Sequence, residues 1–175
     1  MEKRNKIKKI VFTGPECSGK STLSKAIAKK MQLPLVEEYA RQYLNSLGRN
    51  YIYSDLAQIA KGQLNAEKKA IDNIKKNTTI ICDTDLQVIK IWSQKKFGKC
   101  ASFILNNQDI KAYYILCKPD FKWEYDPLRE NEHDRMNLFE IYHQDLVQNN
   151  AHFIITSGPL NERISCIQDV IRKMI

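Results

Sequence analysis

Short apolar runs alternate along this chain with longer segments in which apolar residues recur every three or four positions. The runs carry the β-branched and aromatic residues that favour strands, and they lie at residues 10–12, 35–36, 78–83, 112–117 and 152–156. The longer segments have the spacing of amphipathic helices. Strands that alternate with helices predict an α/β fold, in which a parallel five-stranded sheet is covered on both faces in three layers.

The expected helices have recognisable ends. Pro34, Gly48 and Gly98 are expected to stop three of them, because proline and glycine end helices. A long helix is expected to begin at Ser54, and a shorter one covers residues 138–148. These helices are the crossovers that connect one parallel strand to the next.

The first strand leads into a phosphate-binding motif. Gly14, four further residues, Gly19, Lys20 and Ser21 form the pattern G-x-x-x-x-G-K-[ST], and an amphipathic helix follows. The two glycines let successive backbone N–H groups turn toward phosphate oxygens. Lys20 should reach the β- and γ-phosphates, and the Ser21 hydroxyl should bind Mg²⁺. The pattern and its context therefore predict binding of a nucleoside triphosphate.

Acidic residues follow the second and third predicted strands. Glu37 and Glu38 come directly after one strand, and Asp83 ends the other. Because the carboxyl ends of parallel strands meet at one edge of the sheet, we expect these carboxylates beside the phosphate loop. Asp83 fits the Walker B pattern, in which an acid contributes to the magnesium shell. Either Glu38 or Asp83 could serve as the base that activates an acceptor hydroxyl.

A polar segment over residues 118–135 interrupts the alternation. It contains two prolines, no clear period, and the cations Arg129 and Arg135. One interpretation is a solvated surface loop. The interpretation that we prefer is a lid that closes over ATP and brings cations to the transferred phosphoryl group.

Composition and charge narrow the classes of protein. The 175 residues suggest a single domain over residues 1–175, and no apolar run approaches membrane-spanning length. The net charge of +8 suits either nucleic acid or small polyphosphates, but the lysines are scattered and no nucleic-acid motif accompanies them. We therefore expect a cytoplasmic protein without a membrane or nucleic-acid partner. The sequence leaves open whether it forms a homo-oligomer.

Some chemically reactive residues are expected to be structural. Cys82 and Cys117 lie in predicted strands, and Trp92 lies on the apolar face of a predicted helix. We expect all three side chains in the core. The five cysteines and three histidines show no spacing typical of a metal site.

Four segments, in the order GPECSGKST, EEYAR, ICDTD and KPDFKWEYDPLR, resemble a known family. They look like the P-loop kinase domain of NadR-type proteins, the ribosylnicotinamide kinase part of a bacterial regulator of NAD biosynthesis. The resemblance covers nearly the whole chain and implies the P-loop nucleoside kinase fold. It also implies ATP-dependent phosphorylation of the 5′-hydroxyl of nicotinamide riboside to nicotinamide mononucleotide, with ATP and Mg²⁺ as cofactors and a small-molecule nucleoside as partner.

The resemblance further implies roles for individual residues. ATP would be bound by the phosphate loop and a lid arginine, which are Gly14, Pro15, Glu16, Cys17, Ser18, Gly19, Lys20, Ser21, Thr22 and Arg129. The acceptor would be bound by Glu38, Tyr39, Arg41, Asp85, Trp123 and Asp126, with Asp85 beside the phosphates. Ser21 and Asp83 would hold Mg²⁺. The catalytic residues would be Lys20, Glu38, Asp83 and Arg129.

The sequence departs from that family at three points. Cys17 replaces a serine of the loop, which should matter little because the backbone does the binding, and Pro127 stands where the lid often has glycine. The fused adenylyltransferase and DNA-binding domains are not in this sequence, so we expect another protein to adenylylate the product. Two alternatives remain: another nucleoside or nucleotide kinase, and a regulatory P-loop ATPase whose basic N-terminus contacts a partner.

Overall fold

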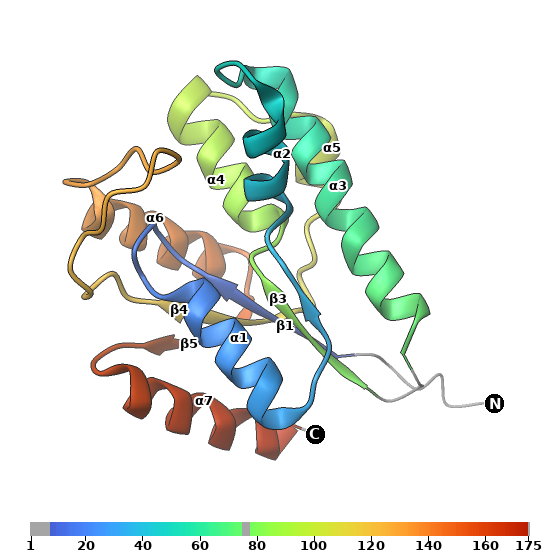
Figure 1. Ribbon diagram of the computed structural model, residues 1–175, viewed down its shortest axis with the longest axis vertical. Coiled ribbons are helices and arrows are strands. Elements are labelled where there is room, and N and C mark those ends of the chain that lie inside the picture. Colours follow the sequence, from blue (N-terminus) through green and yellow to red (C-terminus); the bar gives the residue numbers. More distant parts are fainter. Residues whose placement is uncertain (1–7, 75–77, 175) are drawn as a thin grey trace.

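The computed structural model describes residues 8–74 and 78–174 and has the expected alternation of strands and helices (Figure 1). The strands are β1 (Lys8–Thr13), β2 (Leu35–Val36), β3 (Thr79–Asp83), β4 (Tyr113–Cys117) and β5 (His152–Thr156). The helices are α1 (Lys20–Met31), α2 (Tyr39–Leu47), α3 (Tyr53–Asp72), α4 (Leu86–Phe97), α5 (Ser102–Asn106), α6 (Arg135–Gln148) and α7 (Leu160–Met174). All strand pairs are parallel, in the order β2-β3-β1-β4-β5. The predicted α/β fold with a parallel five-stranded sheet is confirmed.

Two apolar layers fix helices to the sheet. Ile10 and Phe12 of β1 pack on one face against α1 and α7, whereas Val11 packs on the other face against α3, α4 and α6. All three side chains are completely buried, as the alternation of a strand covered on both faces requires. Figure 1 shows α1 and α7 below the sheet and the other helices above it. The predicted burial of Cys82 and Cys117 is also confirmed.

A third apolar cluster joins α2 to α3, α4 and α5. The ring of Tyr39 at the start of α2 lies directly on Gly62 of α3, where an added Cβ would be 1.9 Å from the ring. The Tyr39 backbone N–H donates a hydrogen bond of 3.0 Å to the Gln63 side chain. These contacts fix the position of Glu38, the residue that precedes α2.

Two helix boundaries and one additional helix differ from the sequence-based expectation. The long helix begins at Tyr53, one residue before Ser54. The short helix α5 was not predicted. Helix α6 begins at Arg135, three residues before the expected start, so Arg135 belongs to this helix and the preceding loop is shorter than expected.

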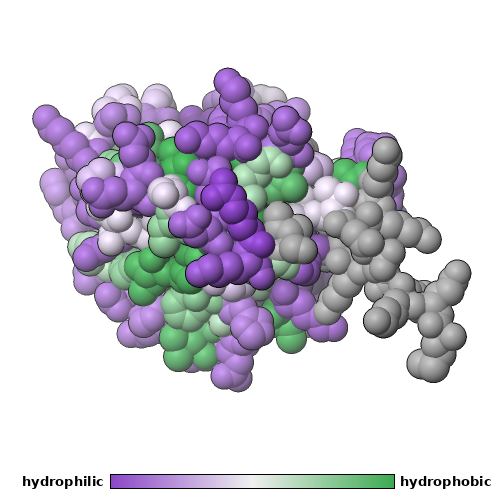
Figure 2. Space-filling view, turned by 90° about the horizontal axis from the view of Figure 1, so that it is seen from below, coloured by the Kyte–Doolittle hydropathy of each residue, from purple (hydrophilic) through white to green (hydrophobic). Residues whose placement is uncertain are grey.

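The surface carries few large apolar side chains. Figure 2, which views the molecule from the side of α7, shows a mostly hydrophilic face with smaller hydrophobic patches between the polar groups. Across residues 8–74 and 78–174, no helix is both long and apolar enough to cross a membrane. The alternative of a regulatory ATPase predicts that the basic N-terminus contacts a partner. Its residues Lys3, Arg4 and Lys6 lie outside the described residues.

Candidate active site

The phosphate loop lies between β1 and α1, at the carboxyl edge of the sheet. Gly14 has a φ of 127°, and a Cβ there would lie 2.7 Å from the carbonyl oxygen of Cys117. Gly19 has a φ of 85°, and a Cβ there would lie 2.6 Å from the ring of Phe121. Both positions therefore need glycine for conformation and for space. Because β1 is flanked by β3 and β4, the loop lies where the strand order reverses, the usual ligand site of such sheets.

A cleft of about 440 Å³ opens on this loop. The predicted residues that line it are Gly14, Pro15, Glu16, Cys17, Ser18, Gly19, Lys20, Ser21, Thr22, Glu38, Arg41 and Arg129. Three segments that are distant in the sequence, namely the phosphate loop, the start of α2 and the loop before α6, thus meet around one space. The cleft is large enough for small ligands such as nucleotides.

The residues predicted to hold Mg²⁺ lie next to each other. Asp83 is buried at the end of β3, and among the described residues its Oδ1 has no hydrogen-bond partner. Burial raises the pKa of its carboxyl, while a hydrogen bond with Ser21 and the charge of Lys20 lower it. An unpartnered carboxylate oxygen beside a hydroxyl is a donor set that suits Mg²⁺, which prefers oxygen ligands. The residues present therefore fit the ion.

Glu38 brings a second carboxylate to the cleft. Burial raises the pKa of this carboxyl, and nearby Asp83 raises it further, whereas Lys20 and Arg41 lower it. The Lys20 ammonium donates a hydrogen bond of 2.7 Å to the carbonyl oxygen of Pro15. The arrangement combines a more basic carboxylate with a cation at the phosphate loop, as proton abstraction beside a phosphate would require.

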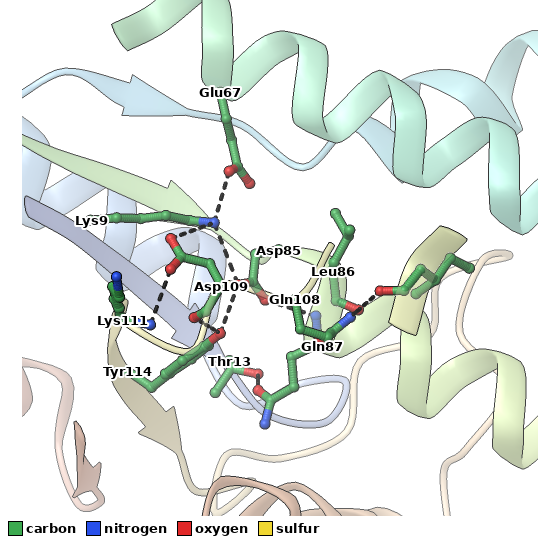
Figure 3. Close-up of polar contacts among 11 residues, drawn as sticks. Lys9, Thr13, Glu67, Asp85, Leu86, Gln87, Gln108, Asp109, Lys111 and Tyr114 are labelled. Atoms are coloured by element: carbon green, nitrogen blue, oxygen red, sulfur yellow. Dashed lines mark hydrogen bonds and ion pairs between the residues drawn. The ribbon is translucent and has the colours of Figure 1, made fainter. Parts of the chain in front are cut away.

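Asp85 does not reach the cleft, and the predicted contact with substrate is corrected. Its side chain is 1% exposed, begins α4 by accepting a hydrogen bond of 2.9 Å from the Gln87 backbone, and lies 3.5 Å from Lys9. The Tyr114 hydroxyl donates to it at 2.9 Å, and Figure 3 shows this network below α3. Asp85 points into the core because it is the N-cap of α4, two residues past Asp83.

We expect Asp85→Asn to affect stability rather than catalysis. The change removes the charge that faces Lys9, and hydrogen bonds to charged groups contribute about 1.5–3 kcal/mol. Urea unfolding should show a loss of that order, with an unchanged KM for ATP and acceptor. A raised KM with parental stability would restore the substrate-binding role.

Three more predicted residues lie outside the cleft wall. Tyr39 packs on α3, as described above. Asp126 forms an ion pair of 2.9 Å with Arg41, and Trp123 lies 6.0 Å and 5.6 Å from the guanidinium carbons of Arg129 and Arg135. Of these arginines, Arg41 and Arg129 line the cleft, so Asp126 and Trp123 can affect a ligand through them.

Aromatic side chains that the sequence did not point to also line the cleft. Trp92, expected in the core, lines the cleft with Tyr51 and Tyr142. The Trp92 indole N–H donates a hydrogen bond of 3.0 Å to the Tyr51 hydroxyl, and the two rings meet edge to face at 4.9 Å. An apolar helix face gives the same sequence signal whether it lines a core or a cleft, so the pattern alone could not find them.

Arg163 of α7 is a further residue that the sequence did not single out. Its side chain is 1% exposed and donates hydrogen bonds to the carbonyl oxygens of Gly158 at 2.8 Å, Ser18 at 3.1 Å and Lys118 at 3.2 Å. It also pairs with Asp120. This buried cation ties the phosphate loop to the segment that follows β4.

The comparisons with known proteins agree with this geometry. The sequence model of a family described as an AAA domain matches residues 9–163. The chain belongs to this AAA-domain family. No curated protein sequence matches it.

Several solved structures share the fold of this AAA-domain chain. The NadR protein in complex with NR aligns with a TM-score of 0.75 at 19% identity, over 95% of this chain and 51% of that chain. The complex of NadR with NAD and AMP-PNP aligns at 0.72 and 18% identity, over 95% and 49%. Deoxyadenosine kinase from M. mycoides with bound dATP aligns at 0.62 and 19%, over 94% and 99%. The chain spans about half of the NadR chains, and the predicted resemblance to NadR-type P-loop proteins is confirmed.

Proposed function

We propose that this protein is an ATP-dependent kinase that phosphorylates the 5′-hydroxyl of a nucleoside, and that its acceptor is nicotinamide riboside. The observation that carries the proposal is that the Glu38 carboxylate and the phosphate loop line the same cleft. Aromatic side chains line the same cleft, and a switch ATPase without a nucleoside acceptor does not need them. The shared fold with NadR and with nucleoside kinases supports the same reaction class.

Phosphoryl transfer depends mainly on positioning and on neutralisation of charge. The phosphate loop backbone and Lys20 bind the β- and γ-phosphates, and Ser21 and Asp83 would hold Mg²⁺, which would supply further positive charge there. Arg129, at the other wall of the cleft, compensates charge on the transferred group. Glu38 accepts the proton of the acceptor hydroxyl.

The aromatic lining of the cleft favours an acceptor with a flat ring. Trp92 offers a ring surface to the cleft, and Glu38, which lines the same cleft, offers a negative charge. An aromatic face attracts a cation, and nicotinamide riboside carries its positive charge on the ring itself. The cations Lys95 and Lys96 of this wall are each paired with a carboxylate, of Asp134 and Glu130 respectively. The Lys96 ammonium also lies 5.5 Å from the centre of the Tyr51 ring, so Trp92, rather than Tyr51, is the ring that remains for a cationic base.

The residues before α6 act as the lid in this proposal. Leu128, Arg129, Glu130 and Asn131 line the cleft from residues 118–134, a stretch that carries no helix or strand. A loop that supplies cleft residues without regular structure can open and close around ligands. We expect amide exchange of this segment to slow when ATP and acceptor bind together.

The experiment that tests the function is a comparison of acceptors at fixed ATP and Mg²⁺. We expect kcat/KM for nicotinamide riboside to exceed that for adenosine, cytidine, thymidine and their 2′-deoxy forms, with stoichiometric formation of the monophosphate. Rapid phosphorylation of another nucleoside and none of nicotinamide riboside would reject the acceptor but keep the kinase. ATP turnover that no acceptor stimulates would reject the kinase.

A further inference from the structure

The side chain of Glu16, inside the phosphate loop, is bound by the loop before α6. Its carboxylate accepts hydrogen bonds from the Glu130 backbone N–H at 3.1 Å and from the Asn131 backbone N–H at 3.0 Å. The Asn131 side-chain amide lies at 3.4 Å from the same group. These donors are 114 and 115 residues away in the sequence. One side chain thus joins the phosphate loop to the two residues that follow Arg129.

The same loop is anchored to the phosphate loop at its other end by buried contacts. The ring of Phe121 rests on Gly19 and lies 4.3 Å from the guanidinium carbon of Arg163. Arg135 donates a hydrogen bond of 2.9 Å to the Phe121 carbonyl oxygen. Arg163 is buried and paired with Asp120 of this loop. If residues 118–121 moved away, they would leave a buried charge without its partner, which is costly. The rest of the loop is held by more exposed contacts, among them the ion pair of Asp126 with Arg41 and the hydrogen bonds of Glu16.

Hydrogen bonds from backbone N–H groups to a carboxylate are charge-assisted and short in reach. Glu16 is partly exposed, so its bonds can break and re-form at low cost, unlike the buried contacts of Arg163. When they form, Arg129, whose neighbour in the chain is Glu130, is held against the cleft. When they break, the two backbone N–H groups lose their anchor on the phosphate loop, and residue 130 is left with the side-chain contacts of Glu130 with Lys96 and Tyr51 of the cleft wall.

We propose that Glu16 is a positioning residue: its carboxylate fastens the lid at Glu130 and Asn131, so that Arg129 is placed over the phosphate loop during transfer. The proposal rests on the proposed function, because it gives the lid arginine a partner in catalysis. Glu16 acts through Arg129 and does not itself touch the reacting groups.

Three substitutions at Glu16 separate the effect of side-chain length from the effect of its negative charge. Glu16→Ala removes the acceptor, and we expect kcat to fall about tenfold with little change in KM for ATP. Glu16→Gln keeps the length and one acceptor oxygen, and it should recover part of that loss. Glu16→Asp keeps the charge but is one methylene shorter, and it should behave like Ala. A parental kcat for the Asp variant together with an impaired Gln variant would show that the negative charge matters and the reach to residues 130 and 131 does not. That result would overturn the proposal.

A double-mutant cycle with Arg129→Ala tests whether the two residues act together. If Glu16 works through Arg129, the double variant should have the kcat of Arg129→Ala alone. Losses that multiply would overturn the proposal. Glu132→Gln is the matched control, because this lid carboxylate is exposed and lies 4.0 Å from the imidazole of the adjacent His133. It should keep the parental kcat.

Amide exchange at Glu130 and Asn131 provides a measurement that needs no turnover. With a non-hydrolysable ATP analogue bound, these two amides should exchange at least tenfold faster in Glu16→Ala than in the parent or in Glu132→Gln. Equal rates would overturn the proposal even if the protein is an active kinase. Faster exchange in a protein that phosphorylates no nucleoside would support the fastening of the lid and reject only the proposed function.

Discussion

Glu38→Gln is expected to bind ATP and acceptor with parental affinity but to transfer phosphate about 10²–10⁴-fold more slowly, the usual worth of a general base. Glutamine keeps the shape of the side chain at the entrance to α2 but cannot accept the proton of the acceptor hydroxyl. Calorimetric affinities and a single-turnover rate with nicotinamide riboside are the measurements that separate binding from chemistry.

The pH profile checks the same assignment. Burial raises the pKa of Glu38, so the carboxylate becomes protonated at a higher pH than an ordinary glutamate. Because only the unprotonated form accepts a proton, kcat of the parent should fall as the pH decreases through that raised pKa, and Glu38→Gln should lose this limb. A fast Glu38→Gln variant that keeps the limb would transfer the role to Asp83, whose pKa burial also raises.

Lys20→Ala is expected to lower kcat/KM for ATP by about 10²–10³-fold, the cost of removing a preorganised charge from a developing anion. The Lys20 ammonium, which donates a hydrogen bond to the Pro15 carbonyl oxygen, lies at the start of α1 and lines the cleft, where phosphate groups would bind. Steady-state kinetics and titration with an ATP analogue are the measurements. Circular dichroism should show an unchanged fold, since no core residue is altered.

The matched control for that variant is Lys30→Ala. Lys30 lies on the same helix, is exposed and is near its carboxyl end, far from the loop. The Lys30→Ala variant lowers the net charge by the same amount as Lys20→Ala. Any general effect of net charge on the attraction of ATP therefore appears in both variants. Equal activities of the two variants would mean that the phosphate loop does not bind ATP through Lys20.

The fold could be predicted because its signals are local. The glycines at positions 14 and 19 are required by backbone conformation, and the apolar runs mark strands whatever lies around them. The convergence of Lys20, Glu38 and Arg129 on one cleft also followed, since parallel strands place their carboxyl ends at one edge. Which segments meet at that edge could therefore be predicted from order and spacing alone.

Side-chain direction was less accessible, because it depends on partners far along the chain. Asp85 is two residues beyond Asp83, yet it turns into the core, where Lys9 and Tyr114 lie. Arg163 occupies a polar position of an amphipathic helix, and the approach of residues 18, 118, 120 and 121 buries it. Pairings of this kind leave no periodic signal in the sequence.

The contact of Phe121 with Gly19 links two positions that a mutational library would normally treat as independent. A methyl group at position 19 would meet the ring at 2.6 Å, and the left-handed φ of 85° adds strain for any L side chain. Substitutions at position 19 therefore disturb the packing of Phe121 at the start of the lid as well as the binding of phosphates. Variation that aims to change acceptor choice through the lid should keep the aromatic ring at position 121, or randomise both positions together.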